Sequence, residues 1–131
     1  MGEVVTPVDA EALAVGYLKA ELASRSDTAA VATKVANPRP VRSVRVWLAG
    51  TNRQTPVHFY ARLVFECRDA SPVDASQLAR LAYALMKAAE GADYGAVWVA
   101  DVVDVSGPAY FPDPDAGPRY QFTLDVLIRG T

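Results

Sequence analysis

Three stretches of the chain alternate apolar and mostly polar residues with a period of two, the pattern of a β-strand with one buried face. Two of them, at about 44–48 and 59–67, flank a polar loop at 50–56, so we predict an antiparallel hairpin. The third, at 120–129, is the clearest, because large apolar side chains occupy every second position. The alternation therefore predicts a sheet with one buried face.

Two other stretches place apolar residues at the spacing of a helix. The first follows Thr6 and Pro7, a capping hydroxyl and a proline suited to a first turn, and predicts a helix at about 7–25. The second begins with a capping box at Asp74 and carries an apolar stripe until Gly91, which suits a helix C-terminus. We therefore expect two helices that each bury one face.

The remaining stretches are shorter or irregular. Residues 31–35 suit a short strand, the Asn-Pro-Arg-Pro run at 37–40 suits an extended corner, and a strand is expected at about 97–105 before a Pro- and Asp-rich excursion at 107–118. The element order α-β-β-β-α-β-β predicts a two-layer α+β fold, an antiparallel or mixed β-sheet of about four to five strands with two helices packed on one face. We expect a single domain over residues 1–131.

Composition fits a soluble globular domain and narrows its partners. Of the 131 residues, 51% are hydrophobic and 21% are charged. The net charge of −2 argues against binding to nucleic acid or to an anionic membrane through overall charge. The N-terminus lacks the basic and apolar run of a secretory signal, and no apolar stretch approaches the roughly 20 residues that span a bilayer. We therefore expect a cytoplasmic protein with no membrane role.

Residues for nucleophilic chemistry are few. The only histidine, His58, stands at the start of a strand, and no Gly-x-Ser-x-Gly elbow is present, so a serine nucleophile lacks a base. The only cysteine, Cys67, shares a strand face with apolar residues, which favours a buried core thiol over the alternative of a reactive one. One Cys and one His provide no ligand cluster for structural zinc.

Two pairs of aspartates are the remaining candidates for acid–base or metal chemistry. Asp101 and Asp104 have odd spacing on a strand and are expected on opposite faces, whereas Asp113 and Asp115 lie in a turn, where Asp favours local hydrogen bonds. No glycine-rich phosphate loop is present. The sequence therefore predicts no catalytic residue, no metal and no cofactor, and we expect a protein that is not an enzyme.

The charges are unevenly distributed along the chain. Residues 28–65 carry six basic side chains and no acidic one, whereas residues 1–27 and 66–131 are both net acidic. If these stretches form different sides of the fold, copies of the chain can meet basic side to acidic side, a heterologous contact that can close into a ring. The alternative is that the charges only solvate opposite sheet edges.

One strand face combines basic and aromatic side chains. Arg45, Trp47 and Arg62 are expected on the exposed side of the sheet, where they suit either single-stranded nucleic acid or the centre of a subunit interface. We favour the interface and expect no sequence-specific nucleic-acid binding, because six basic side chains in a net acidic chain are a small electrostatic footprint.

Several segments form a familiar combination: an N-terminal helix, the Pro-Arg-Pro corner at 38–40, the Val-Arg-Val-Trp strand at 44–47, the Asp-Ala-Ser-Gln-Leu-Ala-Arg helix at 74–80 and the C-terminal run at 117–130. The most distinctive part is the Phe-Pro-Asp-Pro turn at 111–114, followed by Pro-Arg-Tyr-Gln-Phe at 118–122. Together they resemble the tail terminator proteins of long-tailed, siphovirus-type phages that infect actinobacteria, and the resemblance spans nearly the whole chain.

The resemblance implies a structural virion protein with an α+β fold and no cofactor. In that family a homo-hexameric ring caps the completed tail tube, ends its polymerisation and presents a surface to the neck or head-completion protein. The implied partners are copies of the chain, the tail tube protein and a head-completion or neck protein. The implied location is the host cytoplasm during assembly and then the virion tail at the head–tail junction.

Three alternatives stay open. The nearest is another neck-region structural protein, a head–tail connector or a tail-completion protein, which shares the size and the lack of catalytic residues. A small bacterial binding module comes next. An enzyme comes last, and it would need a ligand-filled cleft near the histidine or the aspartate pairs.

Contact roles are assigned by position as hypotheses. Arg39, Arg42 and Arg45 are candidates for contacts with an acidic neighbour, and Trp47 is a candidate anchor of a subunit interface.

Two loops are candidates for docking to tube or neck. The first is the loop at 50–56, with the polar side chains Asn52, Arg53 and Gln54. The second is the excursion at 108–118, in which Tyr110 and Phe111 either fold back on the core or bind an adjacent subunit. Arg119, at the entry to the last strand, is a further candidate contact.

Overall fold

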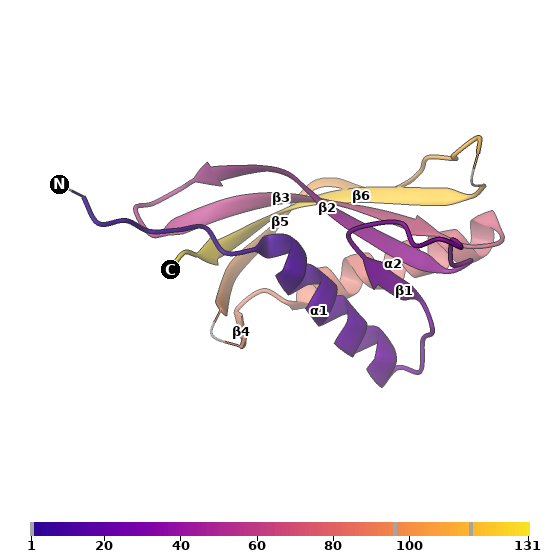
Figure 1. Ribbon diagram of the computed structural model, residues 1–131, viewed down its shortest axis with the longest axis horizontal. Coiled ribbons are helices and arrows are strands. Elements are labelled where there is room, and N and C mark those ends of the chain that lie inside the picture. The colour runs from indigo at the N-terminus through magenta and orange to yellow at the C-terminus, as the bar shows by residue number, and fades with distance from the viewer. Residues whose placement is uncertain (1, 96, 116) are drawn as a thin grey trace.

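The structure is a computed structural model that describes residues 2–95, 97–115 and 117–131 (Figure 1). Its element order begins α-β-β-β-α, as predicted, and continues with three strands instead of two. The elements are α1 (Ala10–Ser24), β1 (Ala30–Ala32), β2 (Ser43–Arg53), β3 (His58–Arg68), α2 (Pro72–Ala88), β4 (Ala92–Tyr94), β5 (Val97–Tyr110) and β6 (Arg119–Arg129).

The strands form one mixed sheet in the order β1-β2-β3-β6-β5-β4. β1 runs parallel to β2, and the other neighbouring pairs are antiparallel, including the predicted β2–β3 hairpin. Both helices lie against the same face of the sheet, so the fold is α+β with two layers (Figure 1). The sheet has six strands rather than about four to five, because a strand as short as β4 shows no alternation that a pattern could reveal.

The first helix begins at Ala10 rather than at about residue 7. Its N-cap is Asp9, whose carboxylate accepts a hydrogen bond from Ala12 N at 3.0 Å. The predicted cap, Thr6, instead exchanges two backbone hydrogen bonds with Thr131, at 2.6 and 2.9 Å. That pairing ties the N-terminal segment to the end of the chain, and the helix starts only after it.

The second helix is likewise capped three positions before the predicted residue, Asp74. Ser71 Oγ accepts a hydrogen bond from Asp74 N at 3.1 Å, and Pro72 occupies the first turn. Gly91 follows the helix with a φ of 74°, a left-handed conformation that favours glycine and agrees with the predicted C-terminal stop. None of the described helices is long and apolar enough to cross a membrane.

The core lies between the sheet and the helices. Phe65 of β3 and Phe122 of β6 are cross-strand neighbours, and their buried rings stack with centroids 4.6 Å apart. Leu18 of α1 and Leu78 of α2 complete the buried cluster from the helix side. The inward positions that alternation predicts are therefore the ones that the helices cover.

Two strands extend further than alternation indicates and shorten the predicted loops beside them. β2 continues past a bulge between Leu48 and Gly50 to Arg53, so the hairpin loop comprises residues 54–57 and not 50–56. β5 continues through two register shifts to Tyr110, so the excursion begins only at Phe111. A bulge adds one residue and inverts the alternation, which hides the strand beyond it.

Candidate assembly surface

The face of the sheet opposite the helices is uncovered in the described part of the chain (Figure 1). Arg45, Trp47 and Arg62 all lie on this outer face, as the alternation predicts. Arg62 is matched within the fold, because its guanidinium forms two hydrogen bonds of 2.9 and 3.0 Å with Asp125 of β6. Arg45 lies opposite Glu66 of β3 and belongs to a larger cluster.

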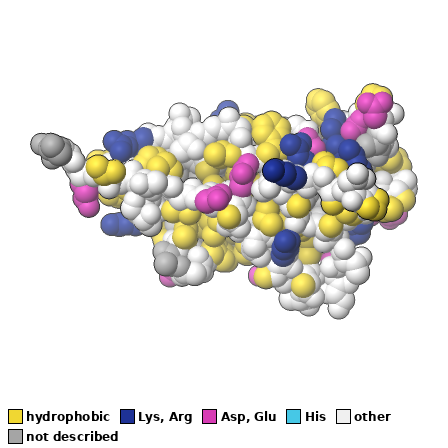
Figure 2. Space-filling model, in the orientation of Figure 1, with side chains coloured by type: hydrophobic (Ala, Val, Ile, Leu, Met, Phe, Trp, Pro, Cys, Tyr) yellow, Lys and Arg dark blue, Asp and Glu magenta, His cyan; other side chains and the backbone are white. Residues whose placement is uncertain are grey.

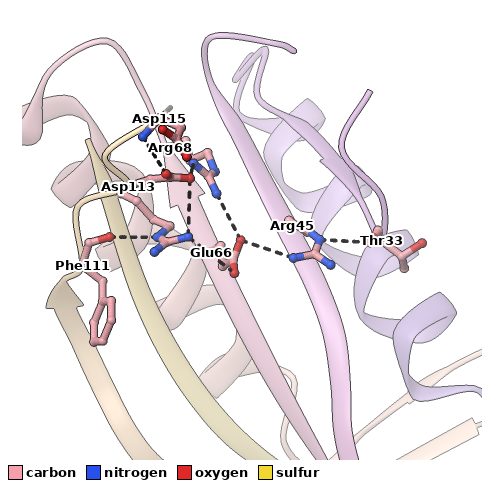
Figure 3. Close-up of polar contacts among 8 residues, drawn as sticks. Thr33, Arg45, Glu66, Arg68, Phe111, Asp113 and Asp115 are labelled. Atoms are coloured by element: carbon pink, nitrogen blue, oxygen red, sulfur yellow. Dashed lines mark hydrogen bonds and ion pairs between the residues drawn. The ribbon is translucent and has the colours of Figure 1, made fainter. Parts of the chain in front are cut away.

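That cluster surrounds Glu66, which is only 7% exposed although it lies on the uncovered face (Figure 3). Its carboxylate has Arg68 at 3.5 Å, Arg45 at 3.6 Å and Arg119 at 3.9 Å. Arg45 also donates a hydrogen bond to the carbonyl oxygen of Thr33, at 3.3 Å. The three guanidinium groups exceed the charge of this one carboxylate, so further acidic groups are needed to balance them.

Asp113 supplies one of these acidic groups from the excursion after β5 (Figure 3). Its carboxylate accepts a hydrogen bond from Arg68 at 2.8 Å, which lowers the pKa of Asp113 to about 2, and a local one from Asp115 N at 3.0 Å. Arg119 Nε also donates to the carbonyl oxygen of Phe111 at 2.8 Å. The predicted turn is therefore present, and a long-range ion pair ties it to β3.

Arg42, a candidate contact residue, already has acidic partners within the fold. Its guanidinium pairs with Asp27 at 2.6 Å and with Asp69 at 2.8 Å, and it donates to Gln77 Oε1 at 2.9 Å. The bond from Arg42 lowers the pKa of Asp27, and these carboxylates raise that of Arg42. Arg42 thus links the segment after α1, the segment after β3 and α2. Arg39, the other candidate of this corner, is exposed.

Trp47 is half-buried rather than a projecting anchor. It lies opposite Val64, which is only 5% exposed on the same uncovered face. The indole Nε1 atom is buried and has no hydrogen-bond partner in the described residues. A buried donor without an acceptor costs free energy, so this position is locally unfavourable.

The hairpin tip places the polar candidates differently from the prediction. Asn52 and Arg53 belong to strand β2, which continues past the bulge, and only Gln54 lies in the loop. All three side chains are exposed. The ring nitrogen Nδ1 of His58 lies 2.8 Å from Thr55 Oγ1, so the histidine helps to close this turn. The tip of the hairpin is therefore a polar and exposed surface.

Tyr110 and Phe111 stay at the surface. The Tyr110 ring packs against Tyr120, with centroids 5.2 Å apart, and is 48% exposed. Phe111 is 56% exposed, and the Arg119 guanidinium lies 6.0 Å from its ring centroid. Neither side chain folds back into the core, which leaves both open to another molecule.

The remaining candidates occupy separate places. Cys67 is fully buried in the core, and burial raises the pKa of its thiol, which matches the prediction of a core cysteine. Asp101 lies opposite Leu127 on the outer side of the sheet, whereas Asp104 accepts a hydrogen bond from Tyr83 of α2 on the inner side. The two aspartates therefore do not share a site.

The basic stretch 28–65 and part of the acidic stretch 66–131 supply strands at opposite edges of the sheet, whereas the acidic stretch 1–27 includes α1, which packs beside β1 and β2 and whose Glu11 accepts a hydrogen bond from Leu48 N at 2.7 Å. The basic stretch 28–65 supplies β1 and β2 at one edge. Residues 88–118, with six acidic and no basic side chains, supply β4 and β5 at the other edge. Figure 2 shows Lys and Arg side chains on this face with Asp and Glu side chains among them, and hydrophobic side chains open to solvent between them. The strands at the two edges of the sheet therefore differ in charge.

Comparison with known proteins adds no relative. No protein-family model matches the chain, and no curated protein is similar to it. A functional conclusion therefore depends on the residues, on their geometry and on the resemblance of the sequence segments.

Proposed function

We propose that this chain is a tail terminator subunit of a long-tailed phage, a structural protein that forms a homo-hexameric ring on the completed tail tube. The ring ends tube polymerisation and provides the surface that joins the head-completion or neck protein. The observation that carries the proposal is the opposite charge of the two sheet edges, since the β1–β2 edge is basic and the β4–β5 edge acidic. Opposite edges of opposite charge favour head-to-tail contacts, the kind that close into a ring.

The two candidate docking segments support the same function. The β2–β3 hairpin tip lies at one end of the central strands, and the loop between β5 and β6 lies at the other end (Figure 1). In a ring whose subunits join through the sheet edges, the strand ends face outward along the ring axis. One end then contacts the tube and the other the neck, as a terminator requires.

The test combines the mass of the protein with its effect on tube growth. Light scattering coupled to size exclusion, over a series of protein and salt concentrations, should detect a hexamer with six times the mass of one chain. Salt should weaken the association of its subunits. The tail tube protein encoded in the same genome is then polymerised with and without this chain, and tube lengths are measured by electron microscopy. The proposal expects shorter tubes with the chain at one end, and unchanged lengths with no bound chain would refute it.

A further inference from the structure

Strand β5 exposes an unusual share of the apolar surface. Ten large hydrophobic residues are exposed in the described structure, and five of them lie on β5 or directly after it. They are Trp98 (41%), Val103 (39%), Val105 (44%), Tyr110 (48%) and Phe111 (56%). Clustered apolar side chains at a sheet edge indicate an interaction site.

The edge of β5 that faces away from β6 has no strand neighbour for most of its length in the described structure. β4 pairs with it only from Val97 to Val99. Beyond that point, Glu90 accepts a hydrogen bond from Val102 N at 3.2 Å, and Lys87 donates to Val102 O at 2.6 Å. The register shifts after Asp104, together with Pro108, then interrupt the regular spacing of peptide groups. A contact on this edge therefore forms mainly through side chains, not through a continuous ladder.

The opposite edge carries the matching features. Val35 (45%), Val41 (67%) and Leu48 (40%) are exposed there. The basic residues beside them, Lys34 and Arg39, are exposed and make no ion pair within the described residues. These two also line a small pocket of about 40 Å³ next to β1, with Arg45 and Arg68 on the same wall and no acidic residue among its lining side chains. We call these five exposed residues the basic edge.

The exposed residues of β5 are accompanied by acidic side chains. Asp101 and Asp104 lie on β5, and Asp93 lies on β4. Lys87 is the nearby cation, and its charge is matched by Asp104 at 3.2 Å. We call Asp93, Asp101, Val103, Asp104, Val105 and Tyr110 the acidic edge.

Only part of the two edges lies at the same height along the strands, because Asp101 shares a row with Leu127, Tyr60 and Asn52 and therefore lies toward the hairpin tip, as does Asp93 beside Trp98. One row of cross-strand partners runs through Tyr110, Tyr120, Cys67, Val44 and Val31. A second row runs through Asp104, Leu124, Leu63 and Leu48. A second copy placed across the sheet therefore brings its basic edge beside the part of the acidic edge from Asp104 to Tyr110, with apolar side chains facing apolar ones.

We propose that the acidic edge of one copy packs against the basic edge of the next, through side chains of the β4–β5 edge on one copy and of β1, the segment 33–41 and Leu48 on the other. This inference rests on the proposed function, since it identifies the contact that joins neighbouring ring subunits. Apolar burial provides the attraction, and the opposite charges fix the orientation, so that two acidic edges or two basic edges do not pair.

Two double variants, one that adds positive charge to the acidic edge and one that reverses the charge of the basic edge, test the contact. The first carries Val103→Lys and Val105→Lys on the acidic edge, and the second carries Lys34→Glu and Arg39→Glu on the basic edge. Each variant alone should associate at least about tenfold more weakly than the wild type in a light-scattering concentration series. An equimolar mixture should regain association, because the unmodified basic edge of the first variant meets the unmodified acidic edge of the second.

Val73→Lys is the matched control, since Val73 is 75% exposed and lies on α2, outside the residues that define the two edges. It should associate as the wild type does, and circular dichroism should show that all variants are folded. A wild type that stays monomeric, variants that associate normally, or a mixture that stays dissociated would each overturn the inference. The tube-length assay separates the two ideas: a monomer that still shortens tubes leaves only the proposed function standing, and edge-dependent association without an effect on tubes leaves only this contact.

Discussion

Removal of the Arg42 guanidinium should destabilise the monomer itself. In Arg42→Met the aliphatic part of the side chain is retained, and the partners Asp27, Asp69 and Gln77 lose their shared donor. The carboxylates of Asp27 and Asp69 are 12% and 11% exposed, so water replaces the guanidinium only in part. The substitution therefore leaves two largely enclosed negative charges without a counter-charge.

The magnitude follows from this partial burial. Breaking a fully buried ion pair from one side costs about 3–5 kcal/mol, and an exposed pair contributes about 0–1 kcal/mol. Since the side chain of Arg42 is 22% exposed, we expect a loss of about 2–3 kcal/mol in the free energy of unfolding at neutral pH. That loss corresponds to a fall of about 6–10 °C in the melting temperature for a domain of this size.

The loss should also depend on pH. Arg42 lowers the pKa of Asp27 in the folded state from its ordinary 3.8, so this contribution to stability is present above that value and disappears as the pH falls through the folded-state pKa. The difference between wild type and Arg42→Met should therefore shrink on acidification below about pH 4.

Urea unfolding followed by tryptophan fluorescence, at neutral and at acidic pH, measures both effects. Arg80→Met is the control, because Arg80 is an exposed arginine of α2 whose guanidinium makes one hydrogen bond, of 3.4 Å to Ser76, and no ion pair in the described residues. It should change stability by less than about 0.5 kcal/mol. Equal stabilities of Arg42→Met and wild type at neutral pH, or a difference that is constant with pH, would refute the reasoning.

Three further outcomes follow from the same contacts. Asp113→Asn should loosen the loop between β5 and β6 by weakening its 2.8 Å ion pair with Arg68, and hydrogen exchange of residues 111–115 should rise while the core stays protected; unchanged exchange would contradict the tether. The Cys67 thiol should react with a disulfide reagent only after unfolding, because it is fully buried, and rapid labelling of the native protein would show otherwise. Phe122→Ala should cost about 3–5 kcal/mol, because it removes a buried ring stacked on Phe65, and a loss below about 1 kcal/mol in urea unfolding would contradict this packing.

The regular parts of the fold could be predicted because each strand face repeats every two residues and each helix face about every four. β6 shows this best, since its alternation from Tyr120 to Ile128 has no interruption and its pairing with β3 has no bulge. Alternation fails where the backbone departs from it, as at the bulge between Leu48 and Gly50. The assignment of Asn52 and Arg53 to a loop failed for that reason alone.

The ion pairs could not be predicted, because they join residues that are distant in sequence. Arg42 is 15 and 27 positions from its two aspartates, and Arg68 is 45 positions from Asp113. Arg68 did have a local signal, since it follows Glu66 at the next position of the same face of β3. A charged pair at alternate positions of a central strand indicates a cluster on the uncovered face.

The ion pairs also change what the basic stretch can do. Its six charges are equivalent in sequence, but three of them already have acidic partners in the fold: Arg42 with Asp27 and Asp69, Arg45 with Glu66, and Arg62 with Asp125. The others, Lys34, Arg39 and Arg53, are exposed and make no ion pair within the described residues. Only these three charges remain to attract a second chain, and they lie on the basic edge and beside the hairpin tip. Association through them should therefore weaken only gradually with salt, because the exposed apolar side chains that carry most of the attraction are not screened.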